Sequence, residues 1–189
     1  RTTGEGGVYT RAGGAPVEFA WIPVGKFPDW TTSGPGDFDG DGRDDILWRH
    51  FATTTTGYFK MDGAPVSWHG LAGVDTSWVV TEIGDFNDDG FDDIYWESRW
   101  NPWGYWDMHG GHLAAFRPLT TAYDAFFRPT LITSGDYAGD GSEDLILATY
   151  DFPSSSTHLI RYDYVGGIVT GTQDLGVWGP SSGGWGIPW

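Results

Sequence analysis

Carboxylate side chains at alternate positions recur in three nine-residue segments of this 189-residue chain: 37–45, 85–93 and 136–144. In the first segment Asp37, Asp39 and Asp41 are spaced two apart, so their carboxylates can converge on one centre. Gly42 follows at a sharp turn that a residue with a Cβ atom resists, and Asp45 ends the segment. An all-oxygen shell of this kind suits a hard cation such as Ca²⁺. The spacing therefore predicts three calcium-binding loops.

Each loop is expected to supply side-chain oxygens and one main-chain carbonyl oxygen. The expected ligands are Asp37, Asp39, Asp41, the carbonyl of Arg43 and Asp45 in the first loop; Asp85, Asn87, Asp89, the carbonyl of Phe91 and Asp93 in the second; and Asp136, Asp140, the carbonyl of Ser142 and Asp144 in the third. In the third loop Ala138 stands where the second ligand is expected. Counting the ligands and their charge predicts that metal affinity falls from the first loop to the third.

Two other interpretations of these segments compete with this one. An EF-hand is disfavoured, because its twelfth position needs a bidentate Glu and here holds Trp48 or Trp96. A polar hairpin turn without metal is the second alternative, since Asp and Gly are ordinary turn residues. Three copies in the same register favour metal loops for the first two segments. The third segment stays open between a metal loop and a plain turn.

The net charge of −16 arises mainly in these loops. They hold 14 of the 26 acidic residues, and the remainder of the chain is nearly balanced in charge. No basic face is visible that would bind phosphates, so no nucleic-acid partner is expected. No apolar run approaches the roughly 20 residues of a membrane-spanning helix, so no membrane span is expected either.

Nothing in the chain predicts catalysis. It has no cysteine, and neither a nucleophile elbow, a zinc-binding helix nor a phosphate-binding loop occurs in it. Adjacent carboxylates on a strand, such as Asp44 and Asp45 or Asp92 and Asp93, point to opposite faces and cannot share a substrate. The segment 109–112 has two histidines that could chelate a transition metal, but an ordinary polar turn is favoured. We therefore expect a protein that is not an enzyme.

A period near 50 residues is typical of stacked structural units. The chain has no stretch of helical periodicity and is rich in glycine, proline and aromatic residues, which favours an all-β fold. A strand that carries Trp30 or Trp78 precedes the loop in the first two units, and three strands follow it. In the first unit these three strands are expected at 45–48, 57–61 and 64–68. Four antiparallel strands per unit predict the blade of a β-propeller.

A single β-propeller domain is expected over residues 1–189, with complete blades near 27–73, 75–122 and 126–175 and a fourth blade split between 1–26 and 176–189. Three arrangements stay open. The two ends close a small ring, or a second copy of the chain completes a larger ring at the exposed strand edge of the incomplete blade, or the chain is part of a longer propeller. Because it begins with Arg1 rather than Met, a processed or trimmed chain is expected.

The first two loops resemble the FG-GAP/VCBS repeat family. Both segments 36–46 and 84–94 carry the pattern Gly-Asp-Phe-x-x-Asp-Gly-x-x-Asp-hydrophobic, and the resemblance covers nearly the whole chain. Members of this family are similar to the calcium-stabilised β-propellers of integrin α-subunit heads, fungal lectins and secreted bacterial proteins. The resemblance implies an extracellular recognition scaffold, with calcium held by the residues named above. Weak calcium loops also fill only where calcium is abundant, so a secreted protein is expected.

A ligand site is expected where aromatic residues lie outside the predicted strands. Trp96 and Trp106 occupy strand positions and are expected in the core, whereas Trp100 and Trp103 lie in a connecting loop. With the neighbouring Arg99 and Asn101, these rings suit the apolar face and the hydroxyl groups of a sugar. Packing against another blade or a partner chain is the alternative. The sequence thus predicts a secreted, calcium-binding recognition module that binds carbohydrate, or else an extracellular protein, as an adhesion module or an accessory module of a secreted enzyme.

Overall fold

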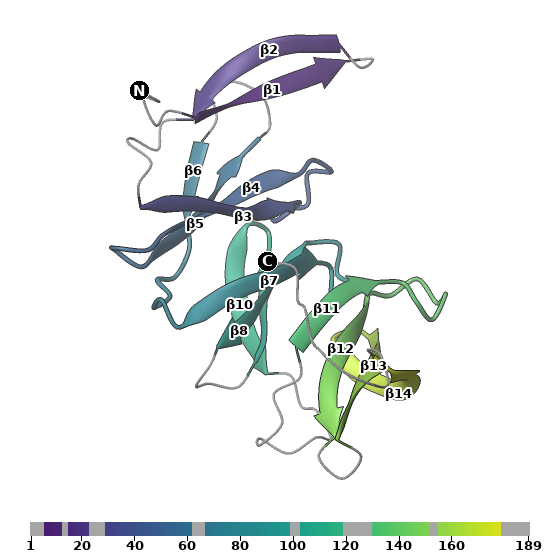
Figure 1. The fold of residues 1–189 in the computed structure, drawn as a ribbon. Coiled ribbons are helices and arrows are strands. Elements are labelled where there is room, and N and C mark those ends of the chain that lie inside the picture. The colour runs from purple at the N-terminus through teal and green to yellow at the C-terminus, as the bar shows by residue number, and fades with distance from the viewer. Residues whose placement is uncertain are drawn as a thin grey trace. The chain divides into compact units, whose positions relative to one another are not determined.

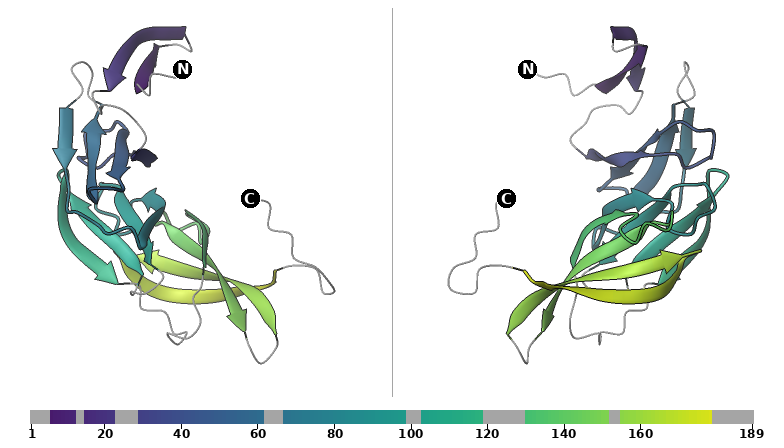
Figure 2. Two further views of the ribbon diagram at one scale, coloured as in Figure 1. Left: turned by 60° about the vertical axis from the view of Figure 1, so that its left-hand side comes forward. Right: turned by 90° about the vertical axis from the view of Figure 1, so that its right-hand side faces the viewer.

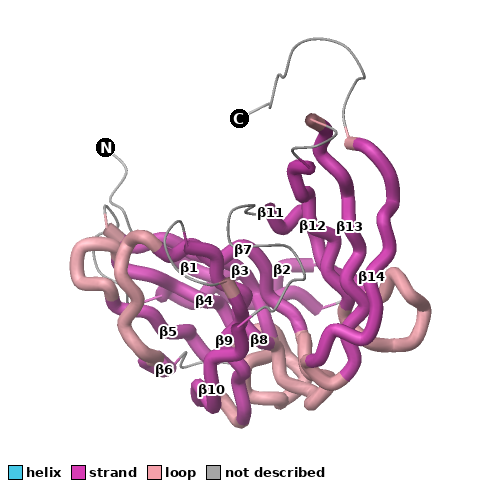
Figure 3. Tube along the Cα trace, turned by 90° about the horizontal axis from the view of Figure 1, so that it is seen from below, coloured by secondary structure: helices cyan, strands magenta, loops and turns pink. Residues whose placement is uncertain are grey.

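The computed structural model describes residues 6–12, 15–22, 29–61, 67–98, 103–118, 130–151 and 155–178. The chain divides into two compact units, residues 1–119 and residues 120–189. Within the described ranges the secondary structure consists of strands and loops (Figure 3), with no helix and hence none that could cross a membrane. The predicted all-β fold is therefore confirmed for the described part of the chain.

Fourteen strands are formed by these residues (Figure 1). In the first unit they are β1 Gly6–Ala12, β2 Ala15–Ile22, β3 Trp30–Gly36, β4 Asp45–His50, β5 Thr55–Lys60, β6 Ser67–Gly70, β7 Trp78–Gly84, β8 Asp93–Ser98, β9 Gly104–His109 and β10 His112–Pro118. In the second unit they are β11 Thr130–Gly135, β12 Asp144–Asp151, β13 Ser156–Val165 and β14 Ile168–Val177.

The strands form one two-stranded and three four-stranded antiparallel sheets. The hairpin β1–β2 stands first, and the strand orders of the larger sheets are β3-β4-β5-β6, β7-β8-β9-β10 and β11-β12-β13-β14. Each of the three is a simple meander, as expected for the three predicted repeats. Among the described residues no sheet closes on itself. Most of the C-terminal part of the split blade, residues 179–189, lies outside the described residues, and β14 extends two residues beyond the predicted end of the third repeat.

The first strand of each larger sheet carries a β-bulge at the same place. The pairing register shifts between Thr32 and Gly34, between Val80 and Glu82, and between Leu131 and Thr133. The extra residues, at positions 33, 81 and 132, have the same spacing as the acidic loops. A bulge increases the local twist of a strand, so this shared irregularity marks the three sheets as copies of one structural unit.

In the first unit a single apolar core joins the sheets β3–β6 and β7–β10. Its buried members are Phe38, Leu47, Tyr58, Val74, Ile94, Trp96, Trp106 and Met108. The expectation that Trp96 and Trp106 belong to the core is thus confirmed. A smaller cluster of Trp48 and Phe59 lies on the other face of β4 and β5, so these strands are covered on both faces by apolar side chains.

The turn between β9 and β10 also contacts the first sheet. Gly111 donates its N–H to the carbonyl of Phe38 at 2.9 Å, and its own carbonyl accepts the hydroxyl of Tyr58 at 3.2 Å. Its φ is +80°, and a Cβ atom there would lie 2.3 Å from the Tyr58 hydroxyl. Only glycine fits this position without a shift, because both the backbone conformation and the contact exclude a side chain.

The second unit consists of the sheet β11–β14, in which β13 and β14 form a long twisted hairpin (Figure 2). Leu145, Leu147, Ile160, Tyr162 and Tyr164 are buried in it. They alternate along β12 and β13, as expected for one face of a sheet that packs on a core.

Candidate metal loops and an aromatic pocket

The three acidic loops share one hydrogen-bonding scheme, centred on their first aspartate. In the first loop Asp37 Oδ1 accepts the backbone N–H of Asp41 at 3.1 Å, and Oδ2 accepts that of Gly42 at 2.8 Å. Asp85 and Asp136 accept the equivalent N–H groups of their own loops, at 2.8–3.1 Å. The glycine that donates to the first aspartate has a φ of +82°, +87° or +95°. The predicted turn role of this glycine is therefore confirmed.

In the first loop the scheme brings three carboxylates together. The N–H of Asp41 points between Asp37 Oδ1 and Asp39 Oδ1, at 3.1 and 3.2 Å. One carboxylate oxygen from each of Asp37, Asp39 and Asp41 lies within 4.8 Å of the others. Oxygens that share a calcium ion at about 2.3–2.6 Å are at most about 5 Å apart, so the spacing fits such an ion.

The expected fourth carboxylate of this loop, Asp45, is not in that group of three, but it has an unpaired oxygen. Asp45 is 1% exposed, and its Oδ1 accepts the N–H of Met61 at 2.9 Å. Its Oδ2 is buried without a hydrogen-bond partner among the described residues. Burial raises the pKa of Asp45 to about 6, with a further contribution from the charges of Asp39 and Asp41. A cation beside this oxygen would remove the cost of leaving it unpaired, so the donor set fits a hard cation.

The second loop offers oxygens in the same arrangement, with Asn87 as its second member. The Asn87 amide nitrogen donates to Asp107 Oδ1 at 3.0 Å, and its oxygen accepts the N–H of Asp89 at 3.0 Å. Asp107 therefore turns the amide so that its oxygen faces the loop. Asp93 is fully buried and accepts the N–H groups of Met108 at 2.8 Å and Phe86 at 3.2 Å. Whether this loop binds a cation stays a prediction.

The third loop keeps its conformation although a ligand is missing. The backbone N–H of Ala138 donates to Asp144 Oδ2 at 2.6 Å, and that of Tyr164 donates to Asp144 Oδ1 at 3.2 Å. Both oxygens of Asp144 are thus satisfied by the backbone. Ala138 supplies no side-chain oxygen, so the third loop has fewer free oxygens for a cation than the other two. The carbonyl ligands expected from Arg43, Phe91 and Ser142 stay predictions.

The first and second loops contact each other directly. Asp92 accepts the N–H of Asp37 on its Oδ2 at 2.7 Å and donates its own N–H to the Asp37 carbonyl at 2.9 Å. The ring of Phe91 lies against Gly40, where a Cβ atom would come within 2.5 Å of it. Asp92 thus binds the neighbouring loop while Asp93 is bonded within its own sheet. The two adjacent carboxylates have different partners, but the expectation that both lie on a strand was wrong, because β8 begins at Asp93 and Asp92 belongs to the loop.

Without metal, the buried Asp93 is expected to make the protein less stable as the pH rises. Burial raises its pKa to about 8, from a usual value of 3.8, so the folded state holds the proton more tightly than the unfolded state. The contribution of the protonated Asp93 carboxyl to folding stability is complete below about pH 4 and is lost as the pH rises through about 8. In chelating buffer the melting temperature should fall across this window. The Asp93→Asn variant is expected to have a flatter profile, and a melting temperature that rises from pH 5 to 8 in both proteins would contradict the argument.

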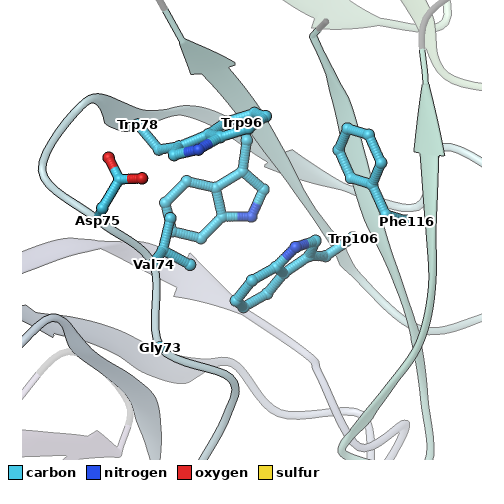
Figure 4. Close-up of a pocket in the computed structure, with 7 residues that line it drawn as sticks. All are labelled: Gly73, Val74, Asp75, Trp78, Trp96, Trp106 and Phe116. Atoms are coloured by element: carbon cyan, nitrogen blue, oxygen red, sulfur yellow. The ribbon is translucent and has the colours of Figure 1, made fainter. Parts of the chain in front are cut away.

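A pocket of about 260 Å³ opens beside the apolar core of the first unit (Figure 4). Its lining consists of Gly73, Val74, Asp75, Trp78, Trp96, Trp106 and Phe116. The rings of Trp96 and Trp106 are 4.8 Å apart, and those of Trp78 and Phe116 are 5.9 Å apart in an edge-to-face arrangement. Four aromatic rings and one carboxylate therefore surround a space that is small by the standards of ligand sites.

Two polar groups lie at this pocket, one buried and one at its rim. Trp96 is 1% exposed, and its Nε1–H has no hydrogen-bond partner among the described residues. Figure 4 shows this nitrogen on the side of the ring that faces Trp106. At the rim, hydrogen bonds from Ser77 lower the pKa of Asp75, so its carboxylate is ionised. The pocket thus presents a buried donor and an exposed acceptor between apolar faces.

A buried arginine from the first sheet holds the wall of this pocket. Arg49, 3% exposed, donates from Nη1 to the carbonyl of Trp78 at 2.6 Å. Its Nη2 donates to the carbonyls of Val74 and Asp75, each at 3.2 Å. The guanidinium group also lies 4.9 Å from the ring centre of Trp96. One cation therefore ties together the segment 74–78 and the ring at the bottom of the pocket.

The sugar site predicted from the sequence stays a prediction. Arg99, Trp100 and Asn101 lie outside the described residues. Trp103 is partly buried and donates its indole N–H to the carbonyl of Ser98 at 3.0 Å, so this polar atom is used within the chain. The sequence did not identify the pocket, although the recurrence of Trp78 at the start of a strand was one available signal.

Comparison of the chain with protein-family models, with curated proteins and with solved structures finds no match. The fold and the loops define the class of this protein: an all-β chain of repeated four-stranded antiparallel sheets, in which acidic loops join the first two strands of each larger sheet.

Proposed function

We propose that this chain is a calcium-binding β-propeller, or part of one, of the FG-GAP/VCBS type, and that it acts as a secreted recognition module for carbohydrate. The repeated meander, the shared bulge and the core between β3–β6 and β7–β10 support the propeller. In a propeller the first strands of neighbouring blades lie close together, and β3 and β7 are in contact. The three converging carboxylates and the unpaired oxygen of Asp45 support calcium.

Carbohydrate is proposed as the ligand because of the aromatic pocket. The apolar face of a sugar ring stacks on tryptophan, and its hydroxyl groups both donate and accept hydrogen bonds. The Nε1–H of Trp96 offers a donor to a ligand oxygen, and Asp75 offers an acceptor at the rim. A space of about 260 Å³ suits one sugar ring and not a folded protein segment. The unpaired, buried indole N–H is the observation that carries this proposal.

The proposal is tested by glycan binding with matched variants. Titration with monosaccharides, followed by tryptophan fluorescence and after a glycan array, should give saturable binding. Phe116→Ala removes an exposed wall of the pocket and should weaken binding by roughly tenfold. Trp68→Ala removes an aromatic residue of similar exposure from β6, outside the pocket, and should leave the affinity unchanged. Absence of binding to every glycan at millimolar concentration would remove the carbohydrate function.

A second candidate function is binding of a protein partner through the second unit. Large apolar side chains are exposed around the hairpin β13–β14: Val165, Ile168, Leu175, Val177 and Trp178, all between 45% and 69% exposed. β14 is also the last strand of its sheet. An apolar strand edge with no neighbouring strand among the described residues is a surface that a second copy of the chain or another extracellular protein could cover. The native mass in solution, with and without calcium, separates a monomer from a self-assembled ring, and Ile168→Lys should reduce any association.

A further inference from the structure

The ammonium group of Lys60 lies against the carboxylates of the first loop. It donates a hydrogen bond to Asp39 Oδ2 and lies 3.1 Å from Asp41 Oδ2. The side chains of Lys60, Asp39 and Asp41 are 21%, 12% and 27% exposed. Two of the three carboxylates that converge in this loop are therefore already paired with a cation that belongs to the chain.

The other two loops have no such cation at this position. The last aspartate of each loop, Asp45, Asp93 or Asp144, accepts a backbone N–H from Met61, Met108 or Tyr164. The residues that precede these three donors are therefore equivalent: Lys60, Asp107 and Asp163. Asp107 is paired with Arg117 at 2.8 Å, and Asp163 is paired with Arg161. In those loops an arginine is paired with the equivalent carboxylate. In the first loop alone, the residue at this position is a lysine bonded to expected ligands.

We propose that Lys60 is a resident counter-ion of the first loop, which competes with calcium there and makes the second loop the tighter site. This inference rests on the proposed calcium loops. It reverses the order of affinity expected from the ligand count alone. With four expected carboxylates and Lys60, the first loop has the same net charge as the second, which has three carboxylates and Asn87. The first loop must in addition give up two contacts of Lys60 before Asp39 and Asp41 can bind an ion.

The second loop has an arrangement that favours the ion instead. Asp107 orients the amide of Asn87 so that its oxygen faces the loop. A side-chain base beside this loop is His109, whose Nδ1 lies 3.4 Å from Asp89 Oδ2 with the side chain 67% exposed. An exposed imidazole at this distance is a weaker competitor than an ammonium group in contact with two carboxylates. The first and second loops share a sequence pattern but differ in the basic side chain beside them, which is Lys60 in the first loop and His109 in the second.

Calorimetric calcium titration tests this inference directly. The double variant Asp89→Ala/Asp140→Ala removes one expected ligand from the second and third loops, so that the first loop is observed. Adding Lys60→Met should tighten calcium binding to this loop by about tenfold or more, because a unit charge a few ångström from a divalent ion has an effect of that size even in water. Lys60→Arg keeps the charge and should change the affinity by less than about threefold. Lys26→Met makes the same change in net charge elsewhere in the sequence and should have little effect.

A second measurement uses the intact chain and leaves Lys60 in place. Asp89→Ala should abolish the tighter phase of calcium binding, and Asp41→Ala the weaker one. Loss of the tighter phase in Asp41→Ala, or an unchanged or weaker affinity on adding Lys60→Met, would overturn the role of Lys60. If the intact chain binds no calcium in any loop, the proposed calcium function itself fails. If calcium binds but its affinity does not change when Lys60 is replaced, only the proposed competition between Lys60 and calcium is refuted.

Discussion

Removal of calcium with EDTA is expected to lower the melting temperature of this protein by about 10–20 °C. An ion that binds only the folded state stabilises it by about 2.7 kcal/mol at a concentration one hundred times its Kd, and two loops are expected to bind well. For a chain of this length, 1 kcal/mol corresponds to about 2–4 °C. The physical reason is local. Without an ion, one oxygen from each of Asp37, Asp39 and Asp41 lies within 4.8 Å of the others, and Lys60 offsets only part of their charge. Asp45 Oδ2 is also buried without a partner among the described residues.

The measurement is a thermal unfolding curve in calcium, in EDTA and after calcium is restored. Asp41→Ala should reduce the difference between the first two curves, whereas Asp29→Asn, a change at an exposed carboxylate outside the loops, should preserve it. A melting curve that EDTA leaves unchanged, together with the absence of calcium by elemental analysis, would rule out the metal loops.

Replacement of Arg49 by methionine is expected to lower the free energy of unfolding by about 3 kcal/mol or more. Hydrogen bonds to charged groups contribute about 1.5–3 kcal/mol each, and Arg49 donates to three carbonyls. Methionine fills part of the volume but leaves these acceptors unpaired in a buried place. Lysine should recover less than half of the loss, because it lacks the planar fork that reaches the carbonyls of Val74, Asp75 and Trp78 together.

This prediction is checked by chemical denaturation in saturating calcium. The control is Arg117→Met, which removes a guanidinium group that is 58% exposed and paired with Asp107, and it should cost less than Arg49→Met. Arg49→Lys is also informative for the pocket, because a shifted segment 74–78 should weaken sugar binding even in a folded protein. Equal stability of Arg49→Met and the parent would show that the cation does not hold this segment.

The fold could be predicted from the sequence in large part because its signals are local. The second strand of each repeat is a short apolar run, and the structure has β4, β8 and β12 there. The turn glycine of the acidic loops needs a positive φ, and the first aspartate accepts N–H groups only four and five residues away. Interactions over such short distances along the chain depend on residue type and spacing alone.

Other features depend on contacts between residues that are far apart in the sequence. Arg49 reaches carbonyls 25–29 residues away, and Lys60 meets Asp39 across 21 residues. The register of β5 against β4 places Lys60 beside the first loop, and the packing of the second sheet on the first forms the pocket around Trp96. The sequence pattern gives the number of expected ligands in a loop, but it does not show that the fold places the ammonium group of Lys60 beside them.

The sequence by itself therefore determined the repeat, the strands of each unit and the acidic loops, since each follows from the preferences of neighbouring residues. Only the tertiary structure decided which carboxylates are already paired and which indole N–H is left without a partner. These outcomes depend on strand register and sheet packing, where a shift of one residue would move every side chain to the opposite face.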